Sequence, residues 1–164
     1  MGFQTAININ PPLAVEGNFA SAGVYHSTIA GVGQLKADTN GLIIARFAWA
    51  NMSTGLATNV KPSDTTNYAI GFARRGDNTA LLTNYLQEHS MTVPKGFPVT
   101  LYDRGDFWVK TSTAATIGQK VFASDTDGSI ATGAAGATVS GYTETSFTVA
   151  SIGAANGLIK ISNI

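Results

Sequence analysis

Turn signals recur about every ten residues along this chain, and short clusters of Val, Ile, Phe, Tyr and Trp lie between them. Gly, Ala, Ser and Thr dominate the composition, yet the regular apolar clusters are unlike a disordered sequence. Short strands separated by evenly spaced turns are typical of a β-sandwich or β-barrel. We therefore predict an all-β fold, a barrel or sandwich built of hairpins.

Hairpins are predicted where Asp, Asn and Gly lie between two apolar segments, because these residues supply the positive φ angles of tight turns. Three such turns lie at residues 38–41, 103–106 and 125–128. The strands that they would join are 34–36 and 42–47, 99–102 and 107–110, and 120–123 and 129–131. Three closing strands are predicted at 139–142, 146–150 and 157–161.

Two segments differ from this pattern. Residues 78–90 carry apolar side chains at helical spacing, which predicts one short helix, with a strand as the alternative. The first twenty residues contain Pro11 and Pro12 and lack a helical period, so an extended segment is expected there. We expect residues 1–20 to form an N-terminal arm and residues 21–164 a single β-rich domain, which suits the length of 164 residues.

Only 12% of the residues are charged, ten of each sign, against about 25% in an ordinary soluble domain. Nucleic-acid binding depends on clustered Lys and Arg, so this balance argues against a nucleic-acid partner. The longest apolar run, 42–45, is too short to cross a membrane, and no membrane partner is expected. The absence of cysteine excludes disulfides, thiolate metal sites and a cysteine nucleophile.

Catalytic and metal motifs are not recognisable. The chain has two histidines, His26 and His89, and neither lies in a catalytic motif, so a hydrogen-bonded or surface role is expected. Residues 125–128 resemble part of an EF-hand loop, but its twelfth position falls on Ala134, where a bidentate Glu is required. We expect no enzyme activity and no cofactor, while a hydrolase with paired carboxylates and a different calcium geometry stay open as alternatives.

Two Arg-Gly-Asp tripeptides, at 75–77 and 104–106, have the composition of exposed turns, and we interpret them as turns. The large aromatic residues are more informative. Phe47 and Trp49 would share one face of a strand, whereas Phe107 and Trp108 would point to opposite faces. Exposed aromatic residues often anchor interfaces, which makes Trp49 and Trp108 candidate contact residues.

Several motifs resemble the structural cement proteins of tailed-bacteriophage capsids. They lie at residues 46–49, 54–55, 70–74, 82–88, 91–101 and 105–109, and the similarity extends over about residues 43–131. The resemblance implies a small β-rich protein that binds the outside of an icosahedral head and bridges neighbouring major capsid subunits, commonly as a trimer. The expected partners are then the phage major capsid protein and further copies of this chain, on the virion surface, after synthesis in the bacterial cytoplasm.

An arm that adds a strand to a partner's sheet edge would give such a protein main-chain contacts with its neighbours. The candidate capsid or subunit contacts are therefore residues of the arm together with the two tryptophans: Phe3, Ile7, Ile9, Pro11, Pro12, Trp49 and Trp108. A receptor-binding module of a virion tail or head fibre is the alternative, since Thr- and Gly-rich β proteins with exposed aromatic residues also serve that role.

Overall fold

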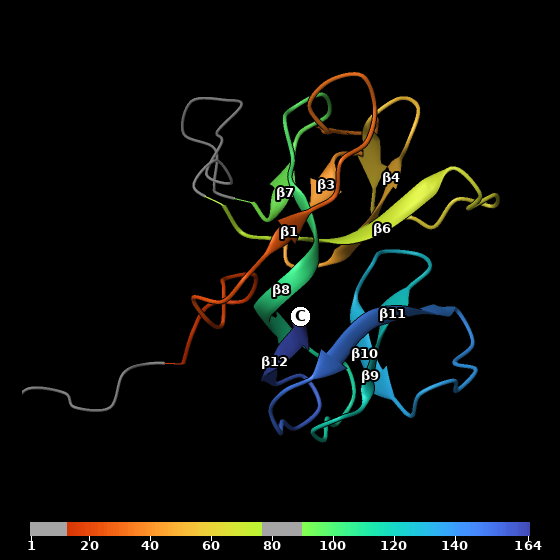
Figure 1. Cartoon of the computed structure of the whole chain (residues 1–164). Coiled ribbons are helices and arrows are strands. Elements are labelled where there is room, and N and C mark those ends of the chain that lie inside the picture. Colours follow the sequence, from red (N-terminus) through yellow and green to blue (C-terminus); the bar gives the residue numbers. More distant parts are fainter. Residues whose placement is uncertain (1–12, 77–89) are drawn as a thin grey trace, which may run out of the picture.

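The computed structural model describes residues 13–76 and 90–164, and Figure 1 shows their arrangement. This part of the chain contains strands and no helix, which confirms the all-β prediction. The strands are β1 His26–Ser27, β2 Lys36–Ala37, β3 Leu42–Ile43, β4 Phe47–Asn51, β5 Leu56–Thr58, β6 Tyr68–Ala73, β7 Thr92–Val93, β8 Leu101–Lys110, β9 Lys120–Ser124, β10 Ile130–Gly133, β11 Tyr142–Val149 and β12 Leu158–Asn163. The predicted helix at 78–90 falls outside the described residues, apart from its last residue.

Strand β8 links the two halves of the molecule. The main sheet has the order β10-β9-β11-β12-β8-β6-β4-β5-β2, and β1 also pairs with β8. The second half of β8 lies antiparallel to β12, with Phe107 opposite Ile161, whereas its first half pairs with β6, with Tyr102 opposite Phe72. One long strand therefore belongs to both halves of the molecule, which are the upper and the lower half in Figure 1.

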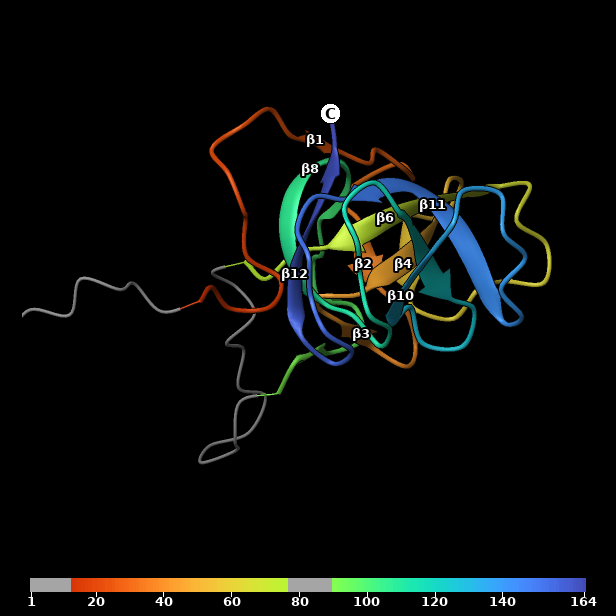
Figure 2. The same ribbon diagram turned by 90° about the horizontal axis from the view of Figure 1, so that it is seen from below.

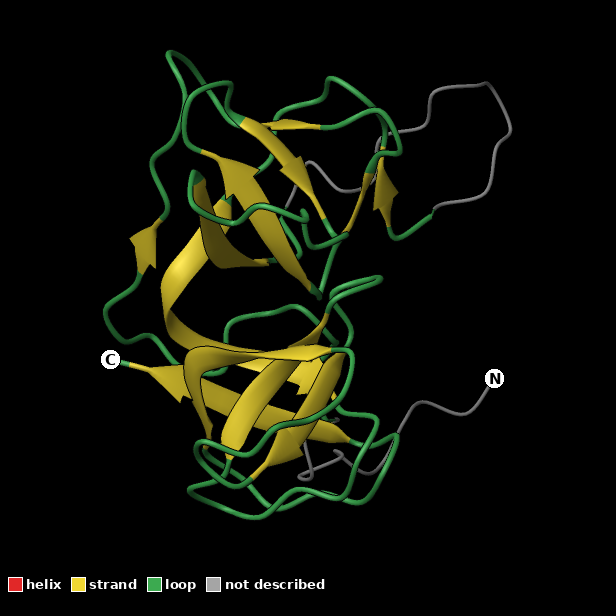
Figure 3. Cartoon of the chain, turned by 90° about the vertical axis from the view of Figure 1, so that its right-hand side faces the viewer, coloured by secondary structure: helices red, strands yellow, loops and turns green. Residues whose placement is uncertain are grey.

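In each half of the molecule, the last strand of the sheet pairs with residues that directly precede or follow β8. Before β8, the Val99 N–H donates to the Leu35 carbonyl next to β2, at 2.9 Å. After β8, the Ser112 N–H donates to the carbonyl of Ile130 in β10, at 2.8 Å. Both ends of the sheet thus return to β8, and the molecule consists of two small barrels that share this strand (Figure 3).

Strand β4 is buried on both faces. Phe47 and Trp49 pack into the larger core, which includes Phe72, Phe107 and Phe147 and extends through both barrels. Ala48 and Ala50 face a second, smaller core in the first barrel. The predicted alternation along this strand is confirmed, and so is that of β8, where Phe107 is buried and Trp108 is half-buried.

The hairpin predicted at 125–128 is confirmed: β9 and β10 pair antiparallel, with Ala123 opposite Ile130. The turn at 38–41 also forms, since the Gly41 N–H donates to the Asp38 carbonyl. The hairpin predicted around it is wrong, because β2 pairs with β5 and β3 with β7. The two short strands leave the turn for different neighbours, and the local turn does not decide their pairing.

The hairpin predicted at 103–106 is also wrong, because these residues lie inside the continuous strand β8. Gly105 has a φ of 129°, so its Asp-Arg-Gly-Asp sequence bends a strand and forms no reversal. Partners on both edges of β8 hold it extended. Of the predicted closing strands, 146–150 and 157–161 overlap β11 and β12, but residues 139–141 are a turn that leads into β11.

The β9–β10 turn joins the second barrel to the first at a point away from β8. The Phe47 N–H donates to the Gly128 carbonyl at 2.9 Å, and the Lys61 N–H donates to the Asp125 carbonyl at 2.8 Å. Gly128 has a φ of 68°, and a Cβ there would lie 1.9 Å from the Phe47 carbonyl oxygen. Only glycine allows this approach, so the turn fits closely against the start of β4.

Candidate interaction surfaces

In the two described segments, no three His, Asp or Glu side chains gather into a group that could hold a metal ion. His26 Nδ1 lies 2.7 Å from Asp103 Oδ1, and both side chains are exposed. This pair fulfils the expectation that His26 is hydrogen-bonded at the surface, whereas His89 lies outside the described residues. No helix long and apolar enough to span a membrane occurs in these segments.

The carboxylates of the β9–β10 turn are engaged in structural contacts. Arg46 Nη1 donates to Asp127 Oδ2 at 2.5 Å, and Lys61 Nζ lies 3.5 Å from Asp125 Oδ1. Burial raises the pKa of Asp127, but hydrogen bonds from Ser129 and Ser124 and the Arg46 charge outweigh it and hold the pKa below its ordinary value. These contacts give the turn the structural role expected from its sequence.

The two candidate tryptophans have different environments. Trp49 is only 3% exposed and packs inside the larger core, so the folded chain offers almost none of its surface to a partner. Trp108 is half-buried on the outer face of β8, and the Lys160 ammonium lies 5.0 Å from the centre of its ring. Trp108 is therefore the tryptophan that a partner can reach.

Residues 17–20, which we name the arm root, attach the N-terminal segment to β8 beside Trp108. The Gly17 N–H donates to the Trp108 carbonyl at 2.7 Å, and the Trp108 N–H donates to the Asn18 carbonyl at 2.9 Å. Phe19 stacks on Phe107, with ring centroids 5.4 Å apart. The second half of the expected arm is thus partly docked, whereas Phe3, Ile7, Ile9, Pro11 and Pro12 lie outside the described residues.

The Arg-Gly-Asp tripeptide at 104–106 lies inside β8, so its interpretation as a turn is wrong. The side chain of Asp106 accepts a hydrogen bond from the hydroxyl of Ser21, just after the arm root. The carboxylate thus holds the N-terminal segment on β8. The second tripeptide, at 75–77, ends beyond the described residues.

One end of the first barrel carries exposed apolar side chains, with the exposed Lys36 at its margin, opposite Leu56 in the β2–β5 pair. These side chains, which we name the first end, are Ile29, Val32, Met52 and Leu56, with exposed fractions of 78%, 103%, 43% and 39%. Two loops hold them together, since the Gly31 N–H donates to the Met52 carbonyl at 2.9 Å. Neither 27–35 nor 47–60 contains a charged residue. An apolar surface without charges is typical of the centre of a protein interface.

The second barrel has a similar surface, which we name the second end: Ile117, 66% exposed, and Ile152, 75% exposed. The loops that carry them pair with each other, since the Ala115 N–H donates to the Gly153 carbonyl at 2.9 Å. Residues 111–119 and 145–159 contain no charge. Figure 1 shows the loops that follow β1 and β4 at one end of the molecule and the loops that follow β8 and β11 at the other, and Figure 2 gives the view from below.

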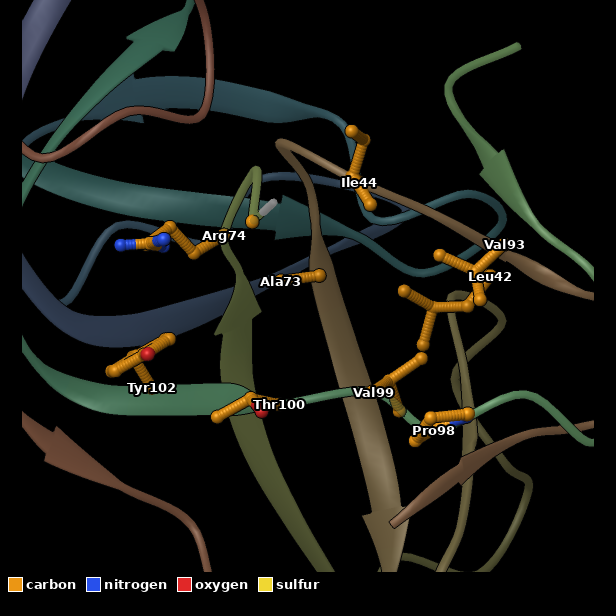
Figure 4. Close-up of a pocket in the computed structure, with 10 residues that line it drawn as sticks. Leu42, Ile44, Ala73, Arg74, Val93, Pro98, Val99, Thr100 and Tyr102 are labelled. Carbon is orange, nitrogen blue, oxygen red and sulfur yellow. The ribbon is translucent and has the colours of Figure 1, made fainter. Parts of the chain in front are cut away.

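A pocket of about 190 Å³ lies between β3, β7 and the start of β8. Figure 4 shows Leu42, Val93 and Val99 on one side of it and Arg74 and Tyr102 on the other. The Arg74 guanidinium also lies 4.4 Å from the centre of the Phe19 ring. The pocket therefore borders the arm root, and its lining combines apolar side chains with the polar groups of Arg74, Thr100 and Tyr102.

Neither end was among the residues singled out from the sequence. Their signal was present as long stretches without charge that also contain isolated Ile, Val, Met or Leu between turn residues. Periodicity does not reveal such residues, because their side chains extend from loops and not from one face of a regular element. A search for uncharged loops would have found both ends.

Comparison with known proteins gives a family match and a structural match. A family model described as the XM1 gp53 minor capsid protein matches residues 3–163. Among solved structures, a chain from "The capsid of Myoviridae Phage XM1" is 20% identical and has a TM-score of 0.60, and the alignment covers 99% of this chain and 97% of that chain. At this identity the structural likeness shows a shared fold. No curated protein matches the chain.

Proposed function

Because this chain belongs to the family of the XM1 gp53 minor capsid protein, we propose that it is a structural protein of a bacteriophage head that acts as cement. It binds the outer surface of the capsid and bridges neighbouring major capsid subunits, which stabilises the shell. The observation that carries this proposal is the pair of exposed apolar ends, whose loops lie at opposite ends of one closely packed body (Figure 1).

Bridging requires two contact surfaces whose separation is fixed. The shared core, the common strand β8 and the close fit of Gly128 against β4 hold the two barrels in one arrangement. If each end contacts a different subunit, the second contact forms at a high effective concentration once the first has formed. Modest apolar contacts at both ends then add up to firm attachment.

Self-association is the second part of the proposal. We propose that three copies assemble as a homotrimer, as the resemblance to cement proteins implies. We assign Trp108 and the N-terminal arm to contacts with the capsid or with further copies of this chain. An arm that contacts a different surface of the next copy forms a head-to-tail interface, and such an interface closes into a ring when the rotation between copies permits.

Cryo-electron microscopy of the purified virion tests the proposal. Density for this chain on the outside of the shell, spanning adjacent major capsid subunits in hundreds of copies, is the expected result. A few to a few dozen copies on the tail or on head fibres would instead support the receptor-binding alternative. Absence of the chain from the shell would reject the cement function.

A further inference from the structure

The apolar side chains of the N-terminal segment alternate along the sequence. From residue 3 to residue 15, five of the seven odd positions are Phe, Ile, Leu or Val, whereas the even positions are Gln, Asn, Ala and Pro. A period of two over this length is the pattern of a strand with one apolar face. The segment also contains no charged side chain, so its burial against another chain carries no cost of burying a charge.

The described end of this segment shows that its own barrels do not cover the apolar face. Leu13 is 76% exposed and Val15 is 47% exposed, whereas Phe19 packs against the core. Between them the Asn18 N–H donates to the Val15 carbonyl, which closes a turn at the arm root. Leu13 and Val15 therefore present apolar side chains that a partner surface can cover.

Sheet edges are the surfaces that accept an added strand. The edge strands of the main path are covered, since residues 96–99 pair with β2 and residues 111–112 with β10. Strand β1 differs, because within the described residues it pairs with β8 on one side and with no strand on the other. Its outer edge is flanked by exposed Val24, Tyr25 and Ile29.

Natural proteins usually protect a free strand edge with charged residues or proline. Residues 17–35, which include β1, contain neither proline nor any Lys, Arg, Asp or Glu. The edge thus lacks protective charges and prolines, although β1 is only two residues long and its register with β8 shifts between His26 and Ser27. Its neighbouring apolar side chains match those of the alternating N-terminal segment, as cross-strand pairs require.

We propose that residues 3–10 of one copy add as a strand to the outer edge of β1 in a second copy. Pro11 and Pro12 favour an extended spacer between this strand and the arm root, and proline cannot donate to a ladder, so the added strand ends before them. Eight residues in a strand span about 26 Å, enough to follow the whole edge. This proposal rests on the proposed function, for which it supplies the self-contact.

The absence of cysteine from the chain permits a direct test by disulfide cross-linking. One batch of protein carries Ile7→Cys or Ile9→Cys, and a second batch carries Val24→Cys. The control batch carries Val60→Cys, whose native side chain is 48% exposed and which precedes Lys61 at the contact between the two barrels, outside both ends and the arm root. The batches are mixed, free or bound to phage heads, then oxidised and resolved without reductant.

Severalfold more disulfide-linked dimer with Val24→Cys than with Val60→Cys, in free protein or on heads, is the expected result. Equal linkage with the two, or none in either setting, would overturn the proposal. A chain carrying both Ile9→Cys and Val24→Cys that forms only an internal bridge would also overturn it, because the arm would then bind its own β1. Sedimentation with heads measures capsid binding independently, so failure of the strand exchange is distinguishable from failure of the cement function.

Discussion

Arg46 and Asp127 are 81 positions apart in the sequence, and their ion pair, 2.5 Å between Nη1 and Oδ2, links the first barrel to the second. It lies beside the hydrogen bond from the Phe47 N–H to the Gly128 carbonyl. Together with β8 these contacts fix the two barrels at two separate places. Attachment at two places opposes a hinge motion of one barrel relative to the other.

The first prediction concerns acid. The pKa of Asp127 in the folded chain is below its ordinary value of 3.8, so its contribution to stability is present above about pH 4 and is lost as the pH falls further. Asp127→Asn should therefore lower stability at pH 7 by about 1 kcal/mol or less, since the pair is partly exposed, and should reduce the loss on acidification. Urea unfolding between pH 7 and pH 3 measures both effects. An unchanged dependence on pH in the variant would contradict the prediction.

The second prediction concerns the fit of the β9–β10 turn. Gly128→Ala should cost about 1–2 kcal/mol for its positive φ and considerably more for the clash with the Phe47 carbonyl. Gly136→Ala is the matched control, because Gly136 has a φ of 71° and no atom within 4 Å of the added Cβ. Thermal unfolding should show a clearly lower Tm for the Gly128 variant. Equal Tm values would show that the turn accommodates the methyl group.

The sequence predicts the elements of this fold better than their pairing. The period of two placed Phe47 and Trp49 on one face of a strand, because side-chain direction is a local property of the backbone. The 125–128 hairpin was predicted correctly, since both of its strands are long enough to pair with each other. The candidate arm residues before Leu13 stay predictions.

The errors arise where distant partners outweigh a local signal. Residues 103–106 have the composition of a turn, but β12, β6 and β1 pair with β8 along its length and hold these residues extended. The 38–41 turn forms, but each flanking strand has only two residues and pairs with a distant neighbour. Which strands pair depends on the assembled sheet. The turn composition and periodicity of a single sequence do not reveal it.

The third prediction separates the two tryptophans. Trp49→Ala removes a large side chain from the core and should cost about 3–5 kcal/mol of folding free energy. Trp108→Ala should cost much less in urea unfolding and should instead weaken binding to heads or to other copies, measured by sedimentation. Trp108 would not be a contact residue if its variant bound heads and self-associated like the original chain.

The fourth prediction concerns the arm. Deletion of Met1–Pro12 should leave the Tm of the body nearly unchanged, because the arm root that follows makes its own hydrogen bonds to β8. The shortened chain should nevertheless attach more weakly to heads. If copies exchange arms, its assemblies in solution should also have a lower molar mass than those of the full chain. Differential scanning calorimetry and light scattering measure these properties. Full capsid affinity in the shortened chain would exclude an arm mechanism.

The last prediction concerns the two ends. A lysine placed in an apolar contact must be buried without a partner, so Val32→Lys and Ile152→Lys should each lower the affinity for heads at least about tenfold. Neither should alter the Tm, because both native side chains are mostly exposed. Val60→Lys is the control, since Val60 is 48% exposed and lies next to Lys61 at the contact between the barrels, away from both ends. If Val32→Lys alone weakened binding, the chain would attach through one end and could not bridge two subunits by its ends.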